Sequence, residues 1–468
     1  MPNTPASPSR QNSVLTINLL SNLLNRAPFH YAWVVVGTLA LVQMVALSVN
    51  FAGGVLVEPL MNERGEFGFS ASSVGLSFTL FFLAGAMLSP VAGWLGERYG
   101  PRKMMIVASL GYCCVMVLVA FVSAPWELWL SFGILRGAVQ AIFMVPLMAA
   151  VSAWFRQRLG LATGLLWAAS GIGPAVMAPL LINFVQGVDW QTTFTYFGLA
   201  AGAFILLLTL VFRSKPADVG ALAYGARAGD VEDSGISPEQ ERARAKVFNQ
   251  HVRRTKAFWN LPAIHGLGCA GHGIILLFVV PFAIMKGLTF TEAALTLSIL
   301  SLVSIPSRML TPMIAEKYGT KPIMATCLMI QGLTVLMLFV STEWWHFYLF
   351  AVLFGIGFGG EWTGYLVINR QYYGNGPIGS VYGWQMSGAQ MGHAFVSWVS
   401  GIMLDMTGSY NVLFAVSAAM SIAGAVVTMT LEDTSKRLIG DWESVVPDVE
   451  GSDSTDTRPA PRAPSAAD

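Results

Sequence analysis

Gly93-Trp-Leu-Gly-Glu97-Arg98-Tyr99-Gly100-Pro-Arg102 is the stretch that decides the fold, because a second stretch of the chain resembles it. Pro312-Met-Ile-Ala-Glu316-Lys317-Tyr318-Gly319-Thr-Lys321 lies 219 residues further on. The same offset relates three pairs of glycines: Gly160 and Gly379, Gly164 and Gly383, and Gly173 and Gly392. Shared glycines alone are typical of packed membrane helices, but a matched charged turn is not. The sequence therefore predicts two related halves.

The composition is that of an integral membrane protein. Of 468 residues, 54% are hydrophobic and 11% are charged, with a mean hydropathy of +0.59. Soluble domains carry about 25% charged residues, so this chain has too few to cover a surface that faces water. The net charge of +1 gives no indication of nucleic-acid binding. All four cysteines lie in apolar runs, and we expect them to be packing residues without disulfides.

Twelve apolar runs are long enough to cross a bilayer, which takes about 20 residues in a helix. The first six are expected near 33–57, 74–95, 104–123, 128–151, 161–185 and 192–212. The second six are expected near 262–285, 294–315, 322–341, 345–368, 380–403 and 411–431. The fold class is thus an all-α membrane protein with twelve transmembrane helices in two pseudo-symmetric six-helix bundles.

Lysine and arginine collect on one side of these spans. Of the 27 basic residues, 23 fall in the terminal segments and in the loops after every second span. The loops on the other side hold only Arg64 and Lys286, and Arg136 and Arg308 lie within spans. Because basic loops stay in the cytoplasm, we expect both termini to be cytoplasmic and the protein to lie in the plasma (inner) membrane.

Five regions follow from this layout. We expect a cytoplasmic segment at 1–30, a bundle at 31–212, a cytoplasmic linker at 213–260, a second bundle at 261–432 and a disordered cytoplasmic tail at 433–468. The linker contains a helix start, with Ser237 as N-cap, Pro238 in the first turn and Gln240 completing a capping box. Val14–Leu24 is too short to span and is expected to be an interfacial helix.

The two repeated turns resemble the loop between helices two and three of the major facilitator superfamily. Glu97 stands where the family usually has Asp, and the charge is kept. The resemblance implies a secondary transporter with its site between the halves, and a loop that latches the halves in one state. The gating residues that it implies are Gly93, Glu97, Arg98, Gly100, Arg102, Lys103, Glu316, Lys317 and Gly319.

A narrower resemblance concerns the fifth and eleventh spans. The stretch 154–164, running on to Ser170-Gly171, is similar to the fifth-helix entry of monocarboxylate transporters and oxalate:formate exchangers. The stretch 370–383 and the run Asp405-Met-Thr-Gly408-Ser-Tyr410 resemble the matching region around helix eleven. This resemblance implies a small organic anion as substrate.

Arg308 is the sharpest candidate for the binding site, because a guanidinium at membrane depth is costly and marks a site or a pathway. Arginine suits bidentate capture of a carboxylate, and the resemblance implies that Arg308 holds the substrate carboxylate. The alternative is an arginine that pairs within the protein or extends to the cytoplasmic face. Mammalian monocarboxylate transporters carry an Asp one helical turn earlier, where this chain has Ser304.

Two further charged residues lie within spans. Arg136 in span four serves either a structural or gating role or substrate contact. Glu361 in span ten is a candidate proton carrier, a fixed counter-ion of an arginine, or a ligand for a cationic substrate. Since helices four and ten are related by the repeat, one hypothesis is that Arg136 and Glu361 face one another.

Polar side chains at membrane depth complete the candidates. His272 and His393 are candidates for proton coupling, although a single histidine on an apolar helix is more often a hydrogen-bonded core residue. The remaining candidates for substrate contact are Asn50, Tyr365, Asn369 and Gln385. For each of them a hydrogen bond between helices is an equal alternative.

The leading hypothesis is a secondary active transporter of a small organic anion, a monocarboxylate, by proton symport and alternating access. The alternatives are an exchanger of organic anions and a membrane sensor or scaffold that does not transport. We expect no enzyme activity, cofactor, metal or nucleic-acid partner, because no nucleophile–base pair, metal cluster or nucleotide-binding motif stands out. The expected partners are the lipid bilayer, the anion and protons, with a monomer as the functional unit.

Overall fold

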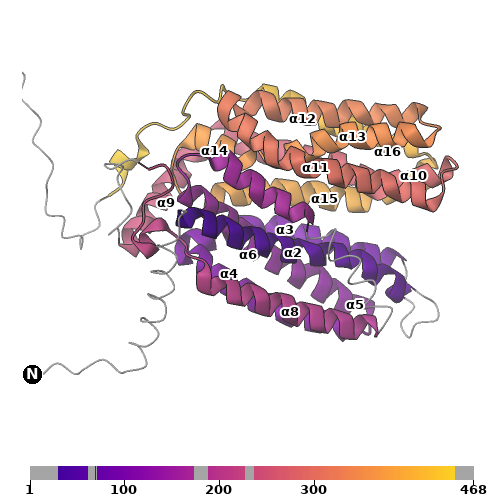
Figure 1. Cartoon of the computed structure of the whole chain (residues 1–468), viewed down its shortest axis with the longest axis horizontal. Coiled ribbons are helices and arrows are strands. Elements are labelled where there is room, and N and C mark those ends of the chain that lie inside the picture. The colour runs from indigo at the N-terminus through magenta and orange to yellow at the C-terminus, as the bar shows by residue number, and fades with distance from the viewer. Residues whose placement is uncertain (1–29, 62–68, 70, 173–187, 227–236, 448–468) are drawn as a thin grey trace, which may run out of the picture.

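The computed structural model describes residues 30–61, 69, 71–172, 188–226 and 237–447, without the side chains of residues 47–61, 71, 72, 238 and 290. Within these residues the structure is helical, and the only β pairing is an isolated bridge between Phe155 and Tyr224. The helices form two bundles that lie side by side (Figure 1). The all-α class predicted from the sequence is confirmed.

The N-terminal bundle contains the helices that correspond to the first six predicted spans. They are α2 (Tyr31–Met61), α3 (Ala71–Tyr99), α4 (Pro101–Ala120), the continuous α5 (Pro125–Leu128), η1 (Trp129–Leu135) and α6 (Arg136–Trp154), the helix described at Leu159–Ile172, and α8 (Trp190–Val211). Gly100 makes the turn between α3 and α4 with φ 85°, a backbone conformation that favours glycine.

The C-terminal bundle repeats this plan. It contains α10 (Lys256–Met285), α11 (Phe290–Tyr318), α12 (Thr320–Val335) continued by η3 (Leu336–Val340), α13 (Trp344–Glu361) followed by α14 (Tyr365–Tyr373), α15 (Gly379–Thr407) and α16 (Tyr410–Met429). Gly319, the repeat partner of Gly100, has φ 93° and makes the same turn between α11 and α12.

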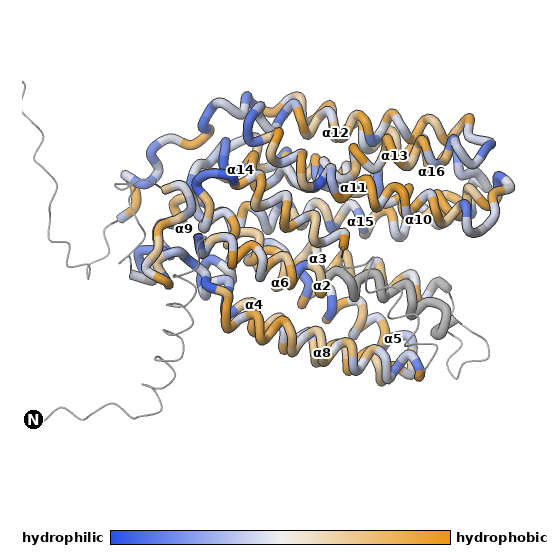
Figure 2. Tube along the Cα trace, in the orientation of Figure 1, coloured by the Kyte–Doolittle hydropathy of each residue, from blue (hydrophilic) through white to orange (hydrophobic). Residues whose placement is uncertain are grey.

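Nine helices in the described part of the chain are long and apolar enough to cross a membrane. The remaining predicted spans lie on two shorter apolar helices, at Tyr31–Ala46 and Leu159–Ile172, and on α15. Hydrophobic residues run along the length of the bundles, and hydrophilic residues gather at their ends (Figure 2). α15 is long but polar, and it lies where the two bundles meet, against α3 (Figure 1).

The linker and the tail meet at one end of the bundles, which we name the α9 face. It carries η2 (Pro216–Val219), α9 (Pro238–Val252) and η4 (Trp442–Val445). α9 begins as the sequence predicts, with the Ser237 hydroxyl accepting the amide of Gln240 at 3.1 Å. The linker ends earlier than expected, because Thr255 caps α10 at its hydroxyl and the helix begins at Lys256.

The sequence predicts a disordered tail, but the first part of that tail is ordered in the structure. Its η4 packs on α9, where the rings of Phe248 and Trp442 lie 5.1 Å apart. Arg244 pairs with Glu443 at 2.8 Å. The buried indole explains the order of this part, because it gives the segment an apolar anchor. The tail beyond 447, the segment 1–29 with its expected interfacial helix, and Arg64 lie outside the described residues.

The sequence repeat has a direct counterpart in space. The helix at Leu159–Ile172 packs on α11, where a side chain at Gly160 would collide with the carbonyl oxygen of Pro312. In the other half of the repeat, α15 packs on α3, where a side chain at Gly93 would collide with the carbonyl oxygen of Gly379. Each half therefore contributes one glycine-lined helix to the other, and the two contacts are related by the repeat.

Close backbone contact between helices also holds each bundle together. A substitution at Gly357 tests this. A Cβ on Gly357 in α13 would lie 2.7 Å from the carbonyl oxygen of Cys327 and 2.8 Å from the amide nitrogen of Gln331. We predict that Gly357→Ala lowers the free energy of unfolding by about 1–3 kcal/mol, because backbone atoms cannot move aside cheaply. The measurement is the melting temperature of the purified protein in detergent.

Gly401→Ala on α15 is the matched control, since nothing lies within 4 Å of a Cβ there. It should leave stability unchanged or raise it by up to about 1 kcal/mol, the difference in helix propensity. Equal melting temperatures for the two variants would contradict this account of the α12–α13 contact.

Candidate functional site

Arg308 lies on α11 and reaches across to the other half. Its Nη1 donates to the hydroxyl of Ser170 at 2.9 Å, and its guanidinium lies 5.2 Å from the ring centre of Phe358. Its Nε is buried without a hydrogen-bond partner in the described part of the protein. Among the described residues no carboxylate lies in ion-pair range of Arg308. No carboxylate of the described residues therefore neutralises the guanidinium, and several of its N–H donors remain open to an anion.

Glu361 is fully buried at the end of α13, and it faces α10. Its Oε2 lies 3.7 Å from Nδ1 of His272, and its Oε1 accepts from the hydroxyl of Tyr365 at 3.5 Å. The hypothesis that Glu361 faces Arg136 is wrong for this structure, which places His272 against the carboxylate instead. A buried carboxylate needs a partner that offers charge or hydrogen bonds, and here the partner is an imidazole.

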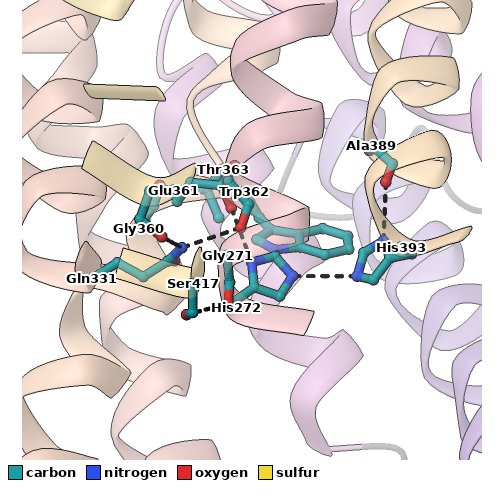
Figure 3. A network of polar contacts seen from close by, with 12 residues as sticks. Gly271, His272, Gln331, Gly360, Glu361, Trp362, Thr363, Ala389, His393 and Ser417 are labelled. Atoms are coloured by element: carbon teal, nitrogen blue, oxygen red, sulfur yellow. Dashed lines mark hydrogen bonds and ion pairs between the residues drawn. The ribbon is translucent and has the colours of Figure 1, made fainter. Parts of the chain in front are cut away.

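His272 links Glu361 to His393 on α15 (Figure 3). The two Nε2 atoms of the histidines lie 3.3 Å apart, and Nε1 of Trp362 lies 3.3 Å from Nε2 of His272. Nδ1 of His393 lies 3.1 Å from the carbonyl oxygen of Ala389. The three residues that the sequence offers for proton coupling are thus brought into one continuous chain across α13, α10 and α15.

The ring of Phe358 connects this chain to Arg308. Its centre lies 4.8 Å from that of His272, and the guanidinium of Arg308 lies on the same ring. The N-terminal half also borders the chain, because Phe82 stacks on His393 at 5.0 Å and Trp167 lies 5.7 Å from Trp362. A positive group and a titratable group therefore share one region between the halves.

Two overlapping sets of side chains in the described residues have donor atoms within 4.8 Å of one another, as a metal site requires. They are Cys269, His272 and His393, and His265, Cys269 and Glu361. The nitrogens of His272 already face Glu361, His393 and Trp362. In the described part of the protein, Nε2 of His272 lies at hydrogen-bonding distance from His393 and Trp362, whereas its Nδ1 has no hydrogen-bond partner and lies in ion-pair range of Glu361.

Among the other candidates, Arg136 contacts two aromatic rings, and Asn369 pairs with Gln385. Arg136 is buried between the rings of Phe81 and Phe132, at 4.9 and 4.7 Å from their centres. Asn369 and Gln385 exchange two amide hydrogen bonds of 2.9 Å, which favours the structural alternative for both. Asn50 lies on α2, and its side chain is outside the described part.

Sequence reasoning missed several residues of this region, and His265 is the clearest case. It is fully buried and stacks on Tyr365 at 3.9 Å, and its Nδ1 lies 3.1 Å from the carbonyl oxygen of Gln385. The spacing of His265, Cys269 and His272 puts them on one face of α10, and this signal could have found it. Nothing in the sequence points to Ser170 as the partner of Arg308.

Two repeat-related carboxylates join the halves at the α9 face. Glu97 on α3 accepts from the amide of Ser380 at 2.6 Å and from its hydroxyl at 2.8 Å, at the start of α15. Glu316 on α11 accepts from the amides of Leu159 and Gly160, at 3.0 and 2.8 Å. Each carboxylate therefore caps a helix N-terminus of the opposite half, where the helix dipole favours negative charge.

A third polar contact supports these two caps. Arg370 on α14 donates to the hydroxyl of Ser152 on α6 at 2.9 Å and also to its carbonyl oxygen. We use the name latch for three contacts together: the cap by Glu97, the cap by Glu316 and this contact of Arg370. It holds the two halves together at the α9 face in this structure.

In the described part of the chain, the contacts of Arg98, Arg102 and Lys317 lie within their own half. Nε of Arg102 donates to the carbonyl oxygen of Thr209 at 3.0 Å. Arg98 lies 5.2 Å from the ring of Trp94, and Lys317 lies 4.9 Å from the ring of Tyr318. Of the expected gating residues, Glu97, Glu316 and Gly93 therefore contact the opposite half. Gly100 and Gly319 make the turns within their own halves.

Comparison with known proteins agrees with this architecture. A family model described as the Major Facilitator Superfamily matches residues 36–319 and 287–464. Monocarboxylate transporter 4 of Gallus gallus is 23% identical over 380 residues, which cover 80% of this chain and 77% of that protein. Monocarboxylate transporter 2 of Homo sapiens is 21% identical over 413 residues, which cover 85% of this chain and 84% of that protein.

Solved structures show the same fold. The proton:xylose symporter XylE has a TM-score of 0.66 at 12% identity, covering 89% of this chain and 99% of that chain. FucP in its outward conformation has a TM-score of 0.64 at 12% identity, covering 86% and 99%. At these identities the likeness concerns the fold alone.

If the latch holds the halves together at the α9 face, removing its carboxylates should favour a state open at that face over the closed state seen in this structure. Glu97→Gln and Glu316→Gln each remove a charged cap, which contributes about 1–3 kcal/mol. We expect each variant to lower the ratio of closed to open states about tenfold. The measurement is the distance between spin labels at residues 103 and 317, in a background without the four cysteines.

Glu292→Gln is the matched control, because this carboxylate caps its own helix α11 at Thr289 and joins nothing across the halves. Its distance distribution should equal that of the parent. Unchanged distances in both latch variants would show that the caps do not hold the halves together.

Proposed function

We propose that this chain, which belongs to the major facilitator superfamily, carries a small monocarboxylate across the membrane together with a proton. The observation that carries the proposal is the position of Arg308, which has no carboxylate partner among the described residues and shares the ring of Phe358 with the Glu361–His272–His393 chain. The likeness to proteins named monocarboxylate transporters supports the substrate class.

The anion binds at Arg308 in this proposal. A planar guanidinium offers two parallel N–H donors to one carboxylate, and in the described part of the protein Arg308 uses one donor, to the hydroxyl of Ser170. The ring of Phe358 excludes water beside the charge, which strengthens its attraction for an anion. A monocarboxylate neutralises one guanidinium, whereas a dianion would need a second cation, and α15 carries no lysine or arginine.

The proton is carried by Glu361 with the two histidines. A buried carboxylate beside an imidazole accepts a proton without leaving an unpaired charge, and the contact between His272 and His393 extends the path to α15. When the anion occupies Arg308 and the proton occupies this chain, the loaded site is neutral. A neutral site lowers the electrostatic cost of moving through a low-dielectric barrier, which couples the two solutes.

Alternating access follows from the two halves and the latch between them. Closing at the α9 face requires the caps of Glu97 and Glu316, and opening there requires both to break. The basic loops of the α9 face support a cytoplasmic placement of this face and of both termini. We take the plasma (inner) membrane as the location and the monomer as the functional unit.

The role of Arg308 is tested by uptake of labelled lactate, pyruvate and acetate into proteoliposomes under an inward proton gradient. We expect Arg308→Ala to reduce uptake at least about a hundredfold, because an anion would lose a buried charge partner. Arg308→Lys should retain partial activity, since a lysine keeps the charge but not the planar pair of donors.

Arg254→Ala removes an exposed cation of the α9 face and serves as the control, with uptake expected at the parental rate. If Arg308→Ala took up substrate at the parental rate, Arg308 would not be the residue that binds the anion. If the parent took up none of the three acids, the monocarboxylate assignment would be wrong, and the family membership would still stand.

Coupling is tested separately at Glu361. Glu361→Gln keeps the shape of the side chain but cannot release a proton, so we expect loss of uptake driven by the proton gradient. Exchange of labelled substrate against unlabelled substrate inside the vesicles should continue, because exchange moves no net proton. Glu343→Gln, at the other end of α13, is the matched control. If Glu361→Gln still accumulated substrate under the proton gradient, Glu361 would not be the proton carrier.

A further inference from the structure

A second cavity lies at the α9 face, away from Arg308. It has a volume of about 850 Å³, within the range of roughly 300–1,000 Å³ that is usual for small-molecule sites. Its walls come from the turn between α3 and α4, the end of α6, the segment 214–218, α9 and the turn 375–379. Neither Arg308 nor the Glu361–His272–His393 chain lines it.

The lining of this cavity is basic. Three of its residues are acidic and six are basic: Arg98, Lys103, Arg156, Lys215, Arg242 and Arg244. The side chains of Arg98, Lys103 and Arg242 are exposed. A concave surface with this excess of cations concentrates positive potential and attracts anions.

The three acidic residues are engaged within the protein. Glu97 accepts from Ser380 in the latch, and Asp218 accepts from the amides of Ser214 and Lys215 at 3.0 and 3.1 Å. Glu241 pairs with Lys215. The cations at Arg98, Lys103 and Arg242 have no carboxylate partner among the described residues. They are therefore available to a ligand.

We propose that this cavity binds a phosphate-bearing anion, which holds the halves closed at the α9 face. Several cations around one cavity suit a group with more than one negative charge, and both Arg and Lys bind phosphate oxygens strongly. The walls belong to both halves and to the linker, so a bound anion contacts all three at once. A ligand that binds only the closed arrangement stabilises it.

This inference does not depend on which solute is transported. The phosphate group belongs either to a small soluble molecule or to the headgroup of an anionic lipid at the membrane surface. Both sources present the same chemistry to the cavity, and the experiment separates them by supplying each without the other.

The experiment compares the full chain with Lys103→Gln/Arg242→Gln in nanodiscs. The control Lys246→Gln/Arg254→Gln removes the same charge from exposed positions that do not line the cavity. In discs of phosphatidylcholine, pyrophosphate binding is measured by calorimetry at constant ionic strength. In a second arm without pyrophosphate, melting temperatures are compared between phosphatidylcholine discs and discs that contain phosphatidylglycerol.

Saturable pyrophosphate binding that weakens about tenfold or more in the cavity variant, but not in the control, would support a soluble ligand. Stabilisation by phosphatidylglycerol that is lost in the cavity variant alone would support a lipid headgroup. Spin labels at residues 107 and 317, which are exposed and do not line the cavity, should then report a larger closed population with the ligand. Equal responses of the two double variants, or no response of the parent in either arm, would overturn the proposal.

Discussion

The structure depends on one constraint, which is that a bilayer offers no hydrogen-bond partners to the peptide backbone. Within a helix this need is met internally, but the first amides of every helix remain open. In this protein the amides that begin α15 and the helix at Leu159–Ile172 are satisfied by carboxylates from the opposite half. The same bonds that complete two helices therefore join the two bundles, and a movement that separates the bundles must expose those helix ends.

The architecture could be predicted from the sequence because its signals are local. Length and apolarity fix the spans, and the repeated turn fixes the relation of the halves. The N-cap at Ser237 was equally readable, since a cap needs only the residues of one turn. Charged residues inside spans were readable for the same reason. Arg308 and Glu361 stand out against their apolar neighbours without any knowledge of their partners.

The partners themselves could not be predicted, because they depend on how each helix is rotated. A helix that is apolar on all sides carries no period that fixes its facing direction. For that reason the sequence offered His272 and His393 singly and did not show their contact. Likewise the sequence leaves substrate contact and a hydrogen bond between helices open for Asn369 and Gln385, and it does not show that they bond to one another. One hypothesis places Arg136 opposite Glu361, whereas in the structure Arg136 lies between two phenylalanines.

The two caps also have a bearing on the origin of the fold. Glu97 caps Ser380 and Glu316 caps Gly160, so each half gives one carboxylate and receives another. An exchange of this kind is isologous, the geometry by which two identical subunits bind about a two-fold axis. A single six-helix unit with one such carboxylate and one such helix start would be complementary to its own copy. Arg308 is one of the residues that break this symmetry, since its counterpart at the same offset is Ser89. A self-complementary scaffold has thus kept its pairing surface while one of its halves acquired a charge that the other lacks.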